Sequence, residues 1–142
     1  METYDPAAIL LVVANQIIEG YMDGTYVTAS FDEDAFTPFT GSGGDTARVR
    51  NRNETGKIVV TLMQGSPGND ILSALHNQDK ILGVPPGPAM LKDLLGRTLL
   101  GGPNCYLAKL PDTSYAKDYQ GREWTIIIPK MQGVVGGNLL AG

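Results

Sequence analysis

Glycine and proline interrupt this chain at short intervals, and this spacing limits the length of any regular element. The 142 residues include 18 Gly and 9 Pro, which separate short apolar segments along most of the chain. Proline cannot donate to a strand ladder, and glycine is favoured in tight turns. Short apolar runs bounded by such residues are typical of β domains with many turns. The sequence therefore predicts a mainly β fold.

The length of the chain favours a single domain over residues 1–142, which is large enough to bury a substantial core. Cys105 is the only cysteine, so it cannot close an intramolecular disulfide. We interpret it as a small buried apolar side chain, and we expect the protein to mature in a reducing compartment. The longest apolar run, residues 7–14, is shorter than the roughly 20 residues of a membrane-spanning helix. No basic residue precedes it, so we expect neither a cleaved leader nor a membrane segment.

Several short segments have the composition of strands, and one has two apolar faces. In residues 57–64 both sets of alternating side chains are largely apolar, so both faces should be covered, by the same domain or by another subunit. We expect residues 46–53 to form a hairpin with this segment. The other predicted strands are residues 9–14, 16–21, 26–31, 89–93, 98–100, 106–110 and 123–129.

One helix is predicted. Ser66 is a suitable N-cap and Pro67 suits the first helical position. An apolar stripe at helical spacing extends the helix to Gln78; it consists of Ile71, Leu72 and Leu75. The proline-rich residues 83–88 should form a connection outside any ladder.

The segment TPFTGSGGD, residues 37–45, is predicted to be a Gly-rich loop without a packed element. Its glycines could resemble a phosphate-binding loop, but the Gly-Lys-Ser/Thr of a P-loop is missing. After the loop, Arg48, Arg50 and Arg52 alternate and should share one face of a strand. Such a row could bind phosphates; alternatively, it deters unwanted pairing at a sheet edge or pairs with nearby acids. We favour the flexible loop and the edge role.

No combination of residues predicts a catalytic, cofactor or metal site. His76 and Cys105 are each single, too few for a zinc ligand set, and His76 is interpreted as a partly exposed helix residue. The run Asp32-Glu33-Asp34 could attract a cation, but it lacks the spacing of a calcium loop. We interpret it as a solvated strand end. The sequence therefore predicts that the protein is not an enzyme and acts through its surfaces.

Charge is divided unevenly along the chain. The first 47 residues carry eight acidic side chains and no Lys or Arg, whereas the rest carry seven acidic and eleven basic side chains. The asymmetry either reflects a solvated surface alone or provides complementary patches that guide assembly of copies. A net charge of -4 argues against a dedicated nucleic-acid binder.

Residues 32–75 and the segment KDYQGREWTI, residues 117–126, resemble tail tube proteins of contractile-tailed bacteriophages. The resemblance extends over about residues 6–130, and its most specific parts are TLMQGSPGND at 61–70 and GREW at 121–124. In that family, and in the similar tubes of type VI secretion systems, a small β-sandwich or barrel with one flanking α-helix forms hexameric rings. The rings stack into a hollow tube.

The resemblance implies a structural virion protein that is assembled in the host cytoplasm and located in the phage tail. Its partners would be further copies of itself and the tail sheath, tape measure, baseplate and tail terminator proteins. Genomic DNA would pass through the lumen without specific binding. The implied subunit interface includes Thr37, Pro38, Phe39, Thr40, Gly41, Ser42, Gly43, Gly44, Asp45, Arg48, Arg50 and Arg52.

Two alternatives stay open. A baseplate or tail-completion component would have the same fold and a different copy number. A monomeric β-barrel that binds a small ligand would use Trp124 to line its pocket. The Gly-rich residues 131–142 have no counterpart in the resemblance, and we interpret them as a C-terminal arm that becomes ordered on assembly.

Overall fold

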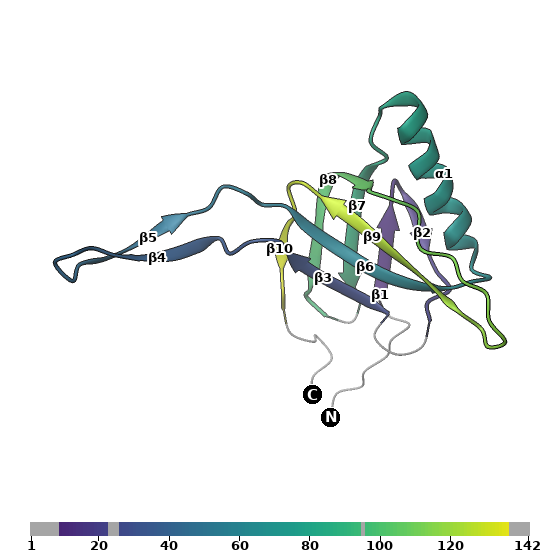
Figure 1. Cartoon of the computed structure of the whole chain (residues 1–142), viewed down its shortest axis with the longest axis horizontal. Helices are drawn as coiled ribbons and strands as arrows, with labels where there is room; N and C mark the ends of the chain where they lie inside the picture. The colour runs from purple at the N-terminus through teal and green to yellow at the C-terminus, as the bar shows by residue number, and fades with distance from the viewer. Residues whose placement is uncertain (1–8, 23–25, 95, 137–142) are drawn as a thin grey trace.

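The computed structural model describes residues 9–22, 26–94 and 96–136, and it is mainly β with one helix (Figure 1). This confirms the predicted fold class. The elements are β1 (Ile9–Val13), β2 (Gln16–Ile18), β3 (Val27–Phe31), β4 (Phe36–Thr40), β5 (Thr46–Arg50), β6 (Gly56–Met63), α1 (Pro67–Leu82), β7 (Gly87–Asp93), β8 (Leu99–Leu107), β9 (Gly121–Ile128) and β10 (Gln132–Val134).

The body of the domain is one antiparallel sheet that curves into two layers. Its strand order is β2-β1-β7-β8-β9-β6-β3, and β10 pairs with β8 outside this path. The first part of β8 pairs with β7, whereas Tyr106 and Leu107 pair with Ile127 and Ile126 of β9. The strand β8 therefore belongs to both layers and joins them. Figure 1 shows β3, β6 and β9 crossing in front of β1 and β7.

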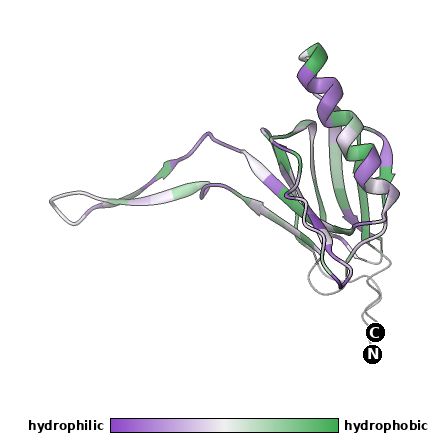
Figure 2. Cartoon of the chain, turned by 45° about the vertical axis from the view of Figure 1, so that its right-hand side comes forward, coloured by the Kyte–Doolittle hydropathy of each residue, from purple (hydrophilic) through white to green (hydrophobic). Residues whose placement is uncertain are grey.

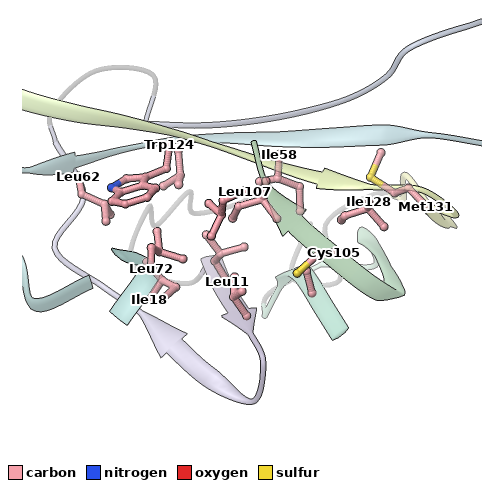
Figure 3. Close-up of a cluster of buried hydrophobic side chains, with 14 residues drawn as sticks. Leu11, Ile18, Ile58, Leu62, Leu72, Cys105, Leu107, Trp124, Ile128 and Met131 are labelled. Atoms are coloured by element: carbon pink, nitrogen blue, oxygen red, sulfur yellow. The ribbon is translucent and has the colours of Figure 1, made fainter. Parts of the chain in front are cut away.

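The core lies between the two layers, as the close-up in Figure 3 shows. Alternate residues of β6 and β9 supply one wall, and β1, β8 and α1 supply the opposite one. Each fully buried side chain of this kind stabilises the fold by about 1.5–3 kcal/mol. The fully buried side chains include Leu11, Val13, Ile18, Ile58, Val60, Leu62, Leu72, Cys105, Trp124, Ile126, Ile128 and Met131.

The helix begins where the sequence predicts and ends later. Ser66 has extended backbone geometry, and its Oγ accepts a hydrogen bond from the Gly68 amide at 3.1 Å. The same hydroxyl donates to the Glu19 carbonyl at 2.5 Å, which ties the N-cap to the segment after β2. The helix continues to Leu82 rather than stopping at Gln78, because Gly83 with φ +68° supplies a left-handed C-cap.

Two predictions about residues 37–64 were wrong. Residues 37–45 do not form a loop throughout, because Phe36–Thr40 is strand β4 and pairs with β5. The expected hairpin between 46–53 and 57–64 does not form either, since β6 pairs with β3 and β9. Local composition favoured a loop, but Pro38 is compatible with a two-stranded ribbon, because both of its strands are edges and an edge strand tolerates proline.

Two further boundaries differ from the prediction. The expected strands 98–100 and 106–110 are one strand, β8, which passes through Pro103 beside an irregularity in the pairing with β7. Gly101 permits the close approach there, because a Cβ at this position would lie 2.4 Å from the carbonyl oxygen of Ala89. The connection predicted at 83–88 ends earlier, since Gly87 pairs with Cys105.

Part of the predicted C-terminal arm is described. Met131 is 1% exposed and packs in the core, and Gln132–Val134 is strand β10. Residues 137–142 lie outside the described residues. Within the described ranges, no helix combines the length and apolar character that crossing a membrane requires.

Candidate subunit interface

Strands β4 and β5 form a ribbon that projects from the body of the domain, and we call residues 36–50 the arm (Figure 1). The two strands pair only with each other, from Phe36 opposite Arg50 to Thr40 opposite Thr46. Every residue of both strands is exposed. An isolated two-stranded hairpin is at best marginally stable in water. The arm is thus the part of the described chain whose stability depends most on another surface.

The arm has two different faces. Side chains directly opposite each other in an antiparallel pair lie on the same face. One face therefore carries Thr37 with Val49 and Phe39 with Ala47, and Phe39 and Val49 are 58% and 53% exposed. This face is largely apolar, and no part of the chain that the structure describes covers it.

The opposite face of the arm is basic and aromatic. Arg48 and Arg50 lie on it together with Phe36 and Pro38, and the Arg48 guanidinium sits 4.3 Å from the centre of the Phe36 ring. The predicted row of three arginines is confirmed for these two alone. Arg52 lies beyond the end of β5 and is exposed.

A cluster of polar side chains holds the root of the arm. Glu33 accepts hydrogen bonds from Nδ2 of Asn51 at 2.6 Å and from Nδ2 of Asn53 at 3.1 Å. These bonds, that from Asn51 first, hold the pKa of the Glu33 carboxyl below its ordinary value. Residues 32–34 are exposed. Glu33, before β4, thus links to the segment after β5 at the point where the arm leaves the body.

The tip of the arm is a short turn over residues 41–45. The Gly41 amide donates to the Asp45 carbonyl at 2.7 Å, and the Gly44 amide donates to the Gly41 carbonyl at 3.0 Å. Gly44 has φ +87°, a conformation that favours glycine. Asp45 is exposed and carries the only carboxylate of the arm.

Apolar side chains are also exposed away from the arm. The C-terminal end of α1 is hydrophobic (Figure 2), and Ile81, Leu82 and Val84 there are 81%, 61% and 62% exposed. Val134 and Val135, at and after β10, are 62% and 82% exposed. Large uncovered apolar groups that occur together are typical of association surfaces.

The second face of β6 is only partly covered. Ile58, Val60 and Leu62 point into the core, as predicted. On the other face Val59 and Thr61 are partly exposed, and Met63 is 38% exposed. A single copy therefore covers one of the two apolar faces fully.

A small pocket of about 250 Å³ lies between the start of α1, β9 and residues 110–115. The only charged residue in its lining is Arg122, which is 6% exposed. Its guanidinium donates to the Gly121 carbonyl at 3.2 Å and lies 5.2 Å from the centre of the Tyr115 ring. The sequence offered one signal for this residue, since Arg122 continues the inward alternation of Trp124, Ile126 and Ile128.

The cysteine and the histidine that were considered for catalysis or metal binding are both buried. Cys105 is fully buried in the core, as predicted, and burial raises the pKa of its thiol to about 11, with a smaller contribution from Asp79. His76 is 8% exposed, so the prediction of a partly exposed histidine was wrong; it faces inward two turns after Gly68. Among the described residues, no three His, Cys, Asp or Glu side chains come together as a metal site.

Comparison with known proteins links this fold to phages and contractile machines. No protein-family model matches the chain. Structural protein ORF10 of Pseudomonas phage KPP10 is 27% identical to it over 144 residues, which cover 96% of this chain and 83% of that protein.

Two solved structures have a similar fold. A chain of the anti-feeding prophage cap, the AFP tube terminating cap, superposes with a TM-score of 0.63 at 9% identity, over 94% of this chain and 92% of its own length. A chain of the PVC sheath/tube terminator, from an extracellular contractile injection system in the extended state, gives 0.65 at 13% identity, over 95% and 99%. At these identities the likeness concerns the fold.

Proposed function

We propose that the chain is a structural subunit of a contractile phage tail, that its copies form hexameric rings, and that the rings stack into the tail tube. The observation that carries this proposal is the exposed arm, with an apolar and a basic face that none of the described residues covers. The sequence similarity to a phage structural protein supports a place in the virion. The fold shared with chains of contractile machines supports a place in the tail.

The arm would make the contact between rings. It projects well beyond the body, so it reaches a neighbouring copy before the bodies themselves touch. Packing Phe39 and Val49 against that copy removes apolar surface from water, which stabilises both the arm and the assembly.

Contacts within a ring would use the body. Strands β2 and β3 are the two ends of the sheet path. An edge strand presents unpaired backbone groups to which another chain can add. Rings need two different complementary surfaces on each copy, because their contacts are head to tail. The exposed apolar groups at the end of α1 and after β10 would supply further buried area.

Charge would guide assembly, and apolar burial would hold it. An exposed ion pair contributes about 0–1 kcal/mol, so the acidic first part of the chain would set register and rate. A stable contact requires roughly 1,000 Å² or more of buried surface. An acidic wall would also let DNA slide through the lumen, since a basic wall would retain it.

A second candidate has specific support. The two solved structures compared above are described as tube-terminating parts, so the chain could complete the tail instead of forming the tube along its length. In that role one or a few rings would occur per particle, and in the tube many. If the chain forms the tube, its expected neighbours are the sheath, tape measure, baseplate and tail terminator proteins. For the ligand-binding alternative, Trp124 does line the small pocket beside Arg122, although it is 1% exposed and belongs to the core. This alternative has less support, because the proteins compared above are described as structural parts.

Electron microscopy of the purified protein and of the virion tests the proposal. We expect rings or tubes of uniform bore, and the number of copies per particle separates tube from terminator. Deleting residues 41–44 should leave the body folded, with an unchanged circular dichroism spectrum, and weaken assembly. A chain that stays monomeric at high concentration with its tail partners present would contradict the proposal, and normal assembly of the deletion would contradict the role of the arm.

A further inference from the structure

Arg122 is a buried cation that forms no ion pair with any described residue of its own chain. It is 6% exposed, and no carboxylate within the described residues forms an ion pair with it. Among the described residues, its guanidinium donates one hydrogen bond, to the Gly121 carbonyl, and its ring contact with Tyr115 uses none of the five guanidinium donors. A buried charge is costly unless it is paired, so this position favours the arrival of an anion.

The surroundings of Arg122 suit a carboxylate. The pocket is lined by neutral side chains apart from Arg122, and the Gln64 amide and the Ser73 hydroxyl lie among them. A guanidinium binds a carboxylate with two parallel hydrogen bonds, and such a pair is stronger in a partly dry site than in water. A volume of about 250 Å³ admits one acidic side chain.

The pocket and the arm lie at opposite ends of the domain. The chain enters β6 at Gly56, directly after the root of the arm, and leaves it at Met63. Arg122 pairs with Leu62, and Gln64 lines the pocket, so the pocket lies at the far end of β6. The eight residues of this strand span roughly 23 Å. Copies that stack in one direction therefore bring the arm of one toward the pocket of the next.

We propose that the Arg122 pocket binds a carboxylate of a second copy of this chain, and that this carboxylate is Asp45 at the tip of the arm. Asp45 is the only acidic residue of the arm, it is exposed, and it belongs to the turn that joins β4 and β5 at the tip of the arm. The inference rests on the proposed function, because it requires stacking of copies. It adds a defined pair of residues to that stacking.

The exposed partner of the pair gives the cleaner test. Asp45→Lys should raise the protein concentration at half-assembly by at least about tenfold, measured by sedimentation velocity and negative-stain microscopy. Asp45→Glu should assemble almost as the wild type does. The matched control is Asp34→Lys, which makes the same charge change at the exposed root and should have a clearly smaller effect.

Charge exchange identifies the partner. Arg122→Glu alone should impair assembly, and combining it with Asp45→Lys should restore assembly at least in part. Thermal unfolding followed by circular dichroism shows whether Arg122→Glu folds; if it does not, the arm variants decide alone. Assembly of Asp45→Lys at the wild-type concentration, or an equal loss with Asp34→Lys, would overturn this inference and leave the proposed function standing. A wild-type chain that never assembles would overturn both.

Discussion

The indole Nε1 of Trp124 donates a hydrogen bond of 2.8 Å to Oδ1 of Asn69, and this bond joins β9 to the first turn of α1. The other end of the same amide, Nδ2 of Asn69, donates to the Met63 carbonyl at 2.9 Å. Asn69 therefore links the helix to two adjacent strands and gives the buried indole its partner. Asn69 and Trp124 both line the Arg122 pocket.

Replacing Asn69 with Leu should destabilise the domain by about 1–3 kcal/mol, because the buried Trp124 N–H would lose its acceptor. Urea unfolding followed by Trp124 fluorescence measures the change. Asn69→Asp is the matched control, since it keeps an acceptor at the same position and should cost less. Equal losses in both variants would mean that the acceptor has no special role.

Replacing Leu62 with Ala should lower the free energy of unfolding by about 2–5 kcal/mol. The reason is that the Leu62 side chain points from β6 into the core and is fully buried there. Leu62→Asp should prevent folding, since it would bury an unpaired charge. Met63→Ala, on the other face of the same strand and 38% exposed, should have a much smaller effect in the single chain. A folded, normally assembling Leu62→Asp protein would contradict the position of this strand.

The Cys105 thiol should be inert in the folded protein near neutral pH. Its pKa is raised to about 11 by burial, so the fold favours the neutral thiol; this contribution is complete below the ordinary value and is lost as the pH rises toward 11. At pH 8 a disulfide reagent such as DTNB should label Cys105 only after unfolding in urea. An added thiol in Ala74→Cys, on the exposed side of α1, should react at once in the folded protein. Rapid labelling of both would contradict the burial of Cys105.

The pKa of the Glu33 carboxyl should lie below the ordinary value of a glutamate, because Asn51 and then Asn53 donate hydrogen bonds to its charged form. Because the pKa of Glu33 is lower in the folded protein, its hydrogen bonds stabilise the root of the arm when the pH is above the ordinary pKa of a glutamate. This stabilisation is lost as the pH falls through the folded pKa. Carbon NMR of the side-chain carboxyl measures this. Asn51→Ala should raise the Glu33 pKa, whereas Ser42→Ala at the tip should leave it unchanged.

Much of the body could be predicted from periodicity. The inward positions of β6 and β9 follow strict alternation, and the start of α1 follows from Ser66 and Pro67. These signals work because each is local and agrees with the final packing. The predicted end of the helix at Gln78 was wrong, because the apolar stripe stops before the left-handed Gly83 that caps the helix.

The arm and the Arg122 pocket were harder to predict, for different reasons. The ribbon β4–β5 buries little in one chain, so its residues lack the apolar alternation that identifies a strand in a core. The pocket is built from segments distant in the sequence, residues 64–73 and 110–124, and their meeting depends on how β9 and α1 pack. The site residues predicted on the arm do lie together, and their role as an interface stays a prediction.

The arm leads directly into β6, which is bonded on both sides, to β9 along its whole length and to β3 over Gly56 to Val60. A pull on the arm along the direction of β6 would load these ladder bonds together, in shear, instead of opening them one after another. Because β8 fastens the two layers to each other, the tension would spread into the rest of the body. In the proposed assembly, tension applied to the arm by a second copy would therefore be shared by the whole body instead of being concentrated at the root of the arm.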